Sequence, residues 1–67
     1  MHKTIEIILH HGEDVLQFNL RYGVTVRELI SQAKEQYGVY LCNVYNVHDK
    51  KLPYGMPLRG SVTFRAE

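Results

Sequence analysis

The hydrophobic residues of this chain recur with two spacings, one typical of strands and the other of a helix. Residues 3–10 and 15–21 alternate between apolar and polar positions, which is the pattern of a strand with one buried face. The residues expected to face the core from these two runs are Ile5, Ile7, Leu9, Leu16, Phe18 and Leu20. A short polar loop with one glycine separates the runs, so they predict an antiparallel hairpin.

Residues 25–38 carry the spacing of a helix. Apolar residues fall at i, i+3, i+4, i+7 and i+11, and they are Val26, Leu29, Ile30, Ala33 and Tyr37. Thr25 is placed to accept a hydrogen bond from the amide of Glu28, whose side chain is placed to reach back, an arrangement called a capping box. Gly38 is suited to end the helix in a left-handed conformation. A single apolar stripe needs a sheet to cover it.

The residues after the helix predict a third strand whose facing stays open. Residues 39–47 are rich in β-branched and aromatic side chains, which favour strands. In one facing, the residues that point to the core are Leu41, Asn43, Tyr45 and Val47. In the other facing, Cys42 and Val44 point to the core.

An irregular link and a short final strand complete the chain. Two prolines and a glycine within residues 52–57 exclude a central strand there, and Leu58 is expected to reach the core from this link. Residues 62–65 predict the final strand, with Val62 and Phe64 facing inward.

The order of the main elements is strand, strand, helix, strand, strand. The first and last strands are the most apolar, so we expect them to lie side by side and parallel in the middle of the sheet. The fold predicted for residues 1–67 is therefore a single α+β domain, in which a four-stranded mixed sheet packs on one helix in the order ββαββ.

Three short motifs match patterns of a known superfold. Residues 25–30 carry a Thr-Val-x-Glu-Leu helix start, and residues 49–52 a charged turn followed by a leucine. Residues 57–64 read Pro-Leu-Arg-Gly-Ser-Val-Thr-Phe, which is similar to a Pro-Leu-x-x-Gly-Asp-x-Val ending. In these motifs the chain resembles ubiquitin-like β-grasp domains over nearly its whole length. Conjugated members and the related sulfur carriers end in a flexible Gly-Gly, whereas this sequence ends Val-Thr-Phe-Arg-Ala-Glu. The resemblance therefore implies the non-conjugated type of the superfold.

Composition narrows the classes of protein to which the chain can belong. With 67 residues, 45% of them apolar, it has enough hydrophobic surface for one small core. The single cysteine excludes an internal disulfide and a four-cysteine iron–sulfur site, and a free thiol favours a reducing compartment, so we expect a cytoplasmic protein. No apolar run has the length of a signal sequence or a membrane span. A net charge of +1 does not favour nucleic acid or anionic lipid as a partner.

Candidate chemistry is confined to a few side chains. His10, His11, Glu13 and Asp14 offer potential metal ligands, but neighbouring residues on a strand point to opposite faces, so the two histidines converge only if the loop curls. Cys42 has no oxyanion-hole motif beside it, and we expect it to act as a small buried hydrophobe. The glycines are spread over turns. We therefore expect no catalytic residue, no metal site and no cofactor, and a protein that is not an enzyme.

Five tyrosines are many for a chain of this length. Tyr37 and Tyr45 are expected to help fill the core, while the others lie at its edges. A protein interface and the stacking of nucleic acid bases are the alternative interpretations.

The sheet face opposite the helix is the candidate binding surface, since nothing in so short a chain is left to cover it. Ile8 is the one apolar residue on the polar side of the first strand, and the first facing of the third strand adds Tyr40, Cys42 and Val44 to the same surface. The residues expected to contact a protein partner are Ile8, Tyr40, Val44, Thr63 and Arg65.

The function expected from these observations is that of a non-catalytic module that binds a protein partner through this exposed sheet face or a free sheet edge. Two alternatives stay open. One is a sulfur carrier or modifier-like protein with a missing or processed C-terminus, and the other is an accessory domain that contacts RNA. We expect a monomer or a weak homodimer, because a free edge strand and an apolar outer face are able to pair with a second copy.

Overall fold

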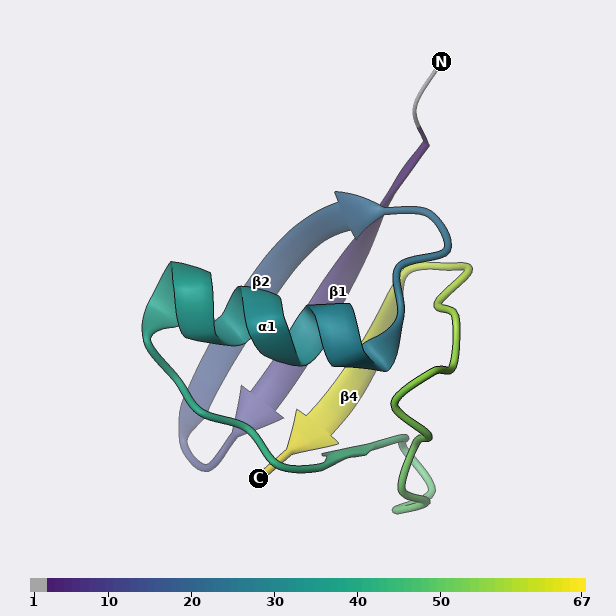
Figure 1. The fold of residues 1–67 in the computed structure, drawn as a ribbon. Helices are drawn as coiled ribbons and strands as arrows, with labels where there is room; N and C mark the ends of the chain where they lie inside the picture. Colours follow the sequence, from purple (N-terminus) through teal and green to yellow (C-terminus); the bar gives the residue numbers. More distant parts are fainter. Residues whose placement is uncertain (1–2) are drawn as a thin grey trace.

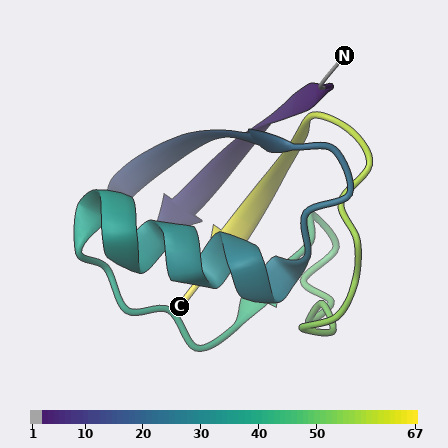
Figure 2. The same cartoon turned by 45° about the horizontal axis from the view of Figure 1, so that its top comes forward.

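The computed structural model describes residues 3–67, which form one sheet with a helix across one of its faces (Figure 1). The elements follow the predicted order, and their bounds are Thr4–His11 for β1, Asp14–Arg21 for β2, Val26–Tyr37 for α1, Val44–Tyr45 for β3 and Val62–Ala66 for β4. The strands form a single sheet in the order β2-β1-β4-β3. Figure 2 shows the helix and the sheet as two layers. The predicted mixed sheet on one helix is confirmed.

β1 and β2 form the predicted antiparallel hairpin. His11 pairs with Asp14, so the loop between them consists of Gly12 and Glu13. Gly12 has a φ of 63°, a left-handed angle that glycine adopts without steric cost and that a type II′ turn requires at its first central position. In this register the alternate residues that were predicted to face the core do so. Buried are Ile5, Ile7, Leu9, Leu16 and Phe18, and Leu20 is partly buried.

The first and last strands lie side by side and parallel, as predicted. Ile7 pairs with Val62, and Leu9 pairs with Phe64. Figure 1 shows β1 and β4 pointing in the same direction under the helix. Phe64 is buried and Val62 is partly buried, so the predicted facing of the last strand is confirmed.

The helix begins and ends where its sequence predicts. Its stripe is buried at Val26, Leu29 and Ala33. The Thr25 hydroxyl accepts a hydrogen bond from the Glu28 amide at 3.2 Å. Gly38 follows the last turn with a φ of 68°, and its N–H donates to carbonyls of that turn.

The second half of the predicted capping box is wrong. The Glu28 carboxylate accepts a hydrogen bond from the guanidinium of Arg21 at 3.0 Å instead of reaching back to the helix start. A bond between two charged groups is stronger than the neutral-donor bond that the capping box offers. As a consequence, the start of α1 is tied to the end of β2.

The third strand is much shorter than predicted, because β3 is restricted to Val44–Tyr45. Leu41 and Val44 are both buried. Two residues three positions apart cannot face the same side of a regular strand, so the chain before β3 is irregular. Neither predicted facing is found whole: Leu41 comes from the first facing and Val44 from the second.

The link between β3 and β4 closes one end of the core. Leu52 and Leu58 are both buried, which confirms the prediction for Leu58. The Leu58 N–H donates to the Val24 carbonyl at 2.8 Å, and the Leu58 carbonyl accepts from the Gly23 N–H at 2.8 Å. The link is therefore fixed against the turn that leads into α1.

Candidate functional site

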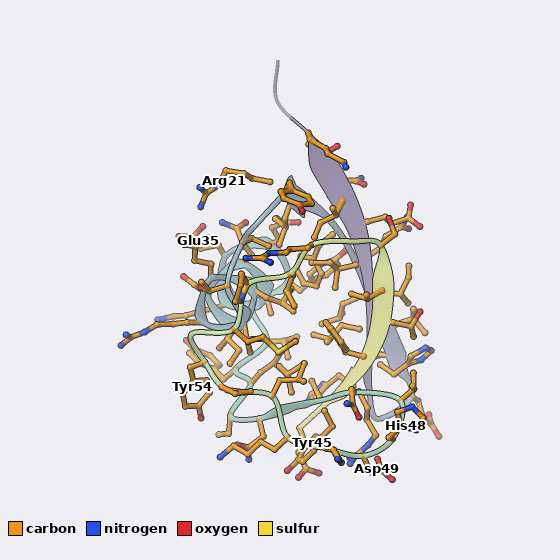
Figure 3. The ribbon with its side chains drawn as sticks, turned by 90° about the vertical axis from the view of Figure 1, so that its right-hand side faces the viewer. Arg21, Glu35, Tyr45, His48, Asp49 and Tyr54 are labelled. Carbon is orange, nitrogen blue, oxygen red and sulfur yellow. The ribbon has the colours of Figure 1, made fainter. Side chains whose placement is uncertain are left out.

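The face of the sheet opposite α1 is exposed to solvent. Figure 3 views the molecule from the side, with α1 to the left of the sheet and side chains projecting from the sheet to the right. We call this surface the outer sheet face, and define it by the residues that alternate with the core residues on the four strands. They include Glu6, Ile8, His10, Val15, Gln17, Asn19, Tyr45, Thr63 and Arg65.

Ile8 lies near the centre of the outer sheet face. Strand pairing places Gln17 beside it on β2 and Thr63 beside it on β4. Ile8 is half-buried by these neighbours. The Gln17 side-chain amide donates to the Glu6 carboxylate at 3.0 Å, which orders the polar groups next to Ile8. The arrangement is a small apolar centre with hydrogen-bonding groups around it.

A charged cluster occupies the corner of the outer sheet face where β3 and β4 meet. The Arg65 guanidinium lies 3.0 Å from the Asp49 carboxylate and 3.4 Å from that of Glu67. The guanidinium also lies over the ring of Tyr45, 4.4 Å from its centroid. The Tyr45 hydroxyl donates to the Glu67 carboxylate at 2.8 Å. Arg65 is therefore held in place by three neighbours.

The carboxylates of this cluster shift two pKa values. The hydrogen bond to Glu67 raises the pKa of Tyr45 above its ordinary value of 10.0, because losing the phenol proton would place two negative charges side by side. The hydrogen bond to Asp49 raises the pKa of Arg65. Both shifts favour the protonated phenol of Tyr45 and the charged guanidinium of Arg65, which are the forms that donate hydrogen bonds to the carboxylates.

Replacing Glu67 by glutamine is expected to lower the pKa of Tyr45 toward 10.0. Because the folded-state pKa of Tyr45 is raised, its stabilising contribution is complete below 10.0 and is lost as the pH rises through the folded value. The measurement is an NMR titration of the Tyr45 ring carbons. Glu35→Gln, on the far side of the molecule, removes the same charge and serves as the control. An unchanged Tyr45 pKa in Glu67→Gln contradicts this assignment of the cluster.

The predicted site residues divide into two groups. Ile8, Thr63 and Arg65 lie on the outer sheet face, as predicted. The predicted positions of Val44 and Tyr40 on that face are wrong. Val44 is 0% exposed and belongs to the core. Tyr40 is 75% exposed, but its ring lies 5.3 Å from the Lys34 ammonium in the last turn of α1, on the helix side of the molecule.

Tyr37 has a role that the sequence did not indicate. Its side chain is 45% exposed rather than filling the core, and its ring packs edge-on against Phe18 at 5.4 Å. The Tyr37 hydroxyl donates to the Gln17 carbonyl at 2.7 Å and accepts from the Gln17 N–H at 3.2 Å. The hydroxyl therefore occupies the middle of the outer edge of β2. The amphipathic helix placed Tyr37 at its end, but no sequence pattern identifies a backbone partner.

The remaining candidate chemistry is dispersed. His10 lies on the outer sheet face, whereas His11 is the last residue of β1. Among residues 3–67 no three His, Cys, Asp or Glu side chains lie close enough to hold a metal ion. Cys42 is exposed, so the interpretation as a buried hydrophobe is wrong. The irregular chain before β3 turns Leu41 inward and Cys42 outward. Within the same residues, no helix has the length and apolar character needed to cross a membrane.

Comparison with known proteins identifies the fold. No protein-family model and no curated protein matches the sequence. Among solved structures, a designed protein based on ubiquitin is similar with a TM-score of 0.75 and 25% sequence identity, over 96% of this chain and 87% of the designed one. The fold is therefore that of a ubiquitin-like β-grasp domain, as the sequence motifs implied.

Proposed function

We propose that this protein is a small non-catalytic ubiquitin-like module that binds another protein through its outer sheet face. One observation carries the proposal: α1 covers one face of the sheet, and no element formed by residues 3–67 covers the other (Figure 3). The uncovered face belongs to a hydrogen-bonded sheet in which β1 is paired on both sides. A partner that binds there meets a preformed surface and orders no loop on this protein.

The chemistry of the outer sheet face suits a protein partner. Ile8 supplies the apolar centre, while Gln17 and Thr63 offer hydrogen-bonding groups on either side of it. Further out, Glu6 and His10 provide a polar rim. Interfaces of proteins commonly combine a water-excluded apolar centre with a polar surround, and truncation of a central residue then costs more affinity than truncation of a residue at the rim.

A photo-cross-linking experiment tests the proposal and identifies the partner. A photoreactive amino acid replaces Gln17 on the outer sheet face, or the half-buried Gln32 of α1, in the other layer of the fold, as the matched control. In the native host, irradiation of the protein with the Gln17 replacement is expected to give a discrete protein adduct, and the Gln32 replacement is expected to give none. Adducts from Gln32 with none from Gln17 would move the interface to the helix and overturn the proposal.

A further inference from the structure

Both edge strands of the sheet, β2 and β3, already form hydrogen bonds with other groups of the protein. The Tyr37 hydroxyl holds both the N–H and the carbonyl of Gln17 on the β2 edge. On the β3 edge, the Leu52 N–H donates to the Val44 carbonyl at 2.8 Å, and Tyr45 is bridged to Lys51. Neither edge is free to add a strand along its length.

A third stretch of edge, on β4, is open. Asn43 and Glu67 exchange both of their backbone hydrogen bonds at 3.0 Å, so the main chain of Glu67 points to the β3 side of the sheet. Backbone groups alternate in direction along a strand, and the N–H and carbonyl of Thr63 therefore point to the same side. β3 pairs with β4 at Ala66 and Arg65, and ends there. Among the backbone hydrogen bonds outside the strand ladders of residues 3–67, none ends on Thr63.

Asn46 is the residue that leaves this edge open. A longer β3 would place Val47 opposite Thr63, because pairing advances by one residue on each strand. The Asn46 side-chain carbonyl instead accepts from the N–H groups of His48 at 2.8 Å and Lys50 at 3.0 Å, which turns the chain away from β4. Val47 is 76% exposed as a result.

An apolar groove runs beside the open edge. It has a volume of about 550 Å³, and the residues that line it are Asn46, Leu52, Met56, Pro57, Leu58, Arg59, Gly60, Val62 and Phe64. Figure 1 shows the link between β3 and β4 passing beside β4. The backbone bridges of this link run to Thr25 and Tyr45, not to β4. Thr63 thus lies in the sequence between Val62 and Phe64, two residues that line the groove.

The charged residue among those that line the groove is Arg59, and it is positive. Between residues 46 and 64 the sequence has Lys50, Lys51 and Arg59, and its one carboxylate is Asp49. Asp49 is paired with Arg65 at 3.0 Å. The ion pairs formed within residues 3–67 do not include Arg59, which lines the groove. The site therefore complements an acidic ligand.

We propose that the Thr63 edge and its groove bind an extended acidic peptide segment of a partner protein. The peptide adds to β4 in line with β3, and exchanges two backbone hydrogen bonds with Thr63. Alternate side chains of an extended peptide point to one side, so one apolar side chain enters the groove while acidic residues beside it approach Arg59. This inference adds a second contact to the proposed function and does not depend on Ile8, so the two proposals fail separately.

The probe is the capped peptide Asp-Glu-Val-Ile-Val-Asp-Glu, titrated into the 15N-labelled protein and followed by NMR. With one backbone pair and one apolar side chain, we expect a dissociation constant on the order of 0.1–1 mM. The amide signals of residues 62–64 are expected to shift and saturate. The peptide Lys-Lys-Val-Ile-Val-Lys-Lys is expected to bind at least about tenfold more weakly, and Arg59→Glu is expected to reverse this order.

Thr63→Pro is the decisive variant, because it removes the outward N–H without removing a bond of the β1–β4 ladder. It is expected to weaken binding at least about tenfold, whereas Thr63→Val, which keeps the N–H, stays within about twofold. If Thr63→Pro does not fold, two peptides methylated on the backbone nitrogen at neighbouring central positions replace it. The nitrogen that faces Thr63 loses its donor on methylation, so one of these peptides is expected to lose binding while the other keeps it.

Three outcomes overturn the inference. The first is the absence of saturable shifts, or equal loss of binding by both methylated peptides. The second is a set of shifts centred on Ile8 that disappears in Ile8→Asp, since the peptide would then lie on the outer sheet face. The third is a concentration-dependent dimer in the absence of peptide whose shifts centre on residues 62–64, since a second copy of the chain would then be the occupant.

Discussion

Replacing Val44 by aspartate is expected to unfold the protein at 25 °C. Val44 is 0% exposed and packs in the core, so the variant must either bury a carboxylate or open the core. An unpaired buried charge costs several kcal/mol. A domain of this length has a total stability of about 3–10 kcal/mol, which a loss of this size largely removes. Loss of the dispersed NMR spectrum and of the urea transition measures the effect.

Val47→Asp is the matched control for this prediction. It makes the same chemical change three residues later, at a side chain that is 76% exposed, and it is expected to change the stability by less than about 0.5 kcal/mol. If Val44→Asp were as stable as Val47→Asp, then Val44 would face solvent, and the outer sheet face would have to include it.

Replacing Phe18 by alanine is expected to destabilise the protein by about 3–5 kcal/mol. Phe18 is 1% exposed at the centre of β2, and its ring meets that of Tyr37 edge-on. Its removal leaves a cavity between the sheet and α1, and withdraws the support that holds the Tyr37 hydroxyl against the β2 edge. Denaturation by urea, followed by circular dichroism, measures the free energy of unfolding.

Two further variants test whether the loss of stability in Phe18→Ala comes from the cavity. Phe18→Leu fills most of the same space and is expected to lose less stability than Phe18→Ala. Tyr22→Ala removes an aromatic side chain that is exposed, and a small loss is expected there. A Phe18→Ala variant that loses less than about 1 kcal/mol would contradict the packing described for α1 on the sheet.

The sequence predicts those parts of the fold in which periodicity and burial agree. The alternation around Ile7 and Phe18 fixes which face of the hairpin is buried, and a shift by one residue would expose every core side chain. The helical stripe ends at Gly38 because a left-handed residue there closes the last turn. In these elements each side chain is determined by its immediate neighbours in the sequence.

The prediction of the third strand is wrong because its side chains are not determined by their neighbours in the sequence. Period-two reasoning assumes a regular strand, but Leu41 and Val44 are both buried and lie three residues apart. The irregular backbone before β3 is stabilised by backbone hydrogen bonds between Cys42 and Asn43 and the distant residue Glu67. No local pattern carries that information, so the predicted positions of Tyr40 and Val44 were wrong.

The candidate site, too, has features that the sequence predicts and features that it does not. The positions of Ile8, Thr63 and Arg65 follow from alternation on β1 and β4 and were predicted. The open edge at Thr63 depends on where β3 stops, which a turn at Asn46 decides. The blocked edge of β2 depends on a hydroxyl from Tyr37, 20 residues away from Gln17 in the sequence. Both edge properties arise from tertiary contacts and become visible in the structure alone.

The central claim is that the outer sheet face binds a protein partner, and the affinity of Ile8 variants for the cross-linked partner tests it most directly. Ile8→Thr keeps a β-branched side chain at the same position, and Gln32→Asp introduces the same carboxylate on α1, in the other layer of the fold. Both variants serve as comparisons. With NMR spectra showing each variant folded, Ile8→Asp is expected to weaken binding at least about tenfold, while Gln32→Asp stays within about twofold. Equal affinities of Ile8→Asp and the wild-type protein, or a larger loss in Gln32→Asp, would contradict the account.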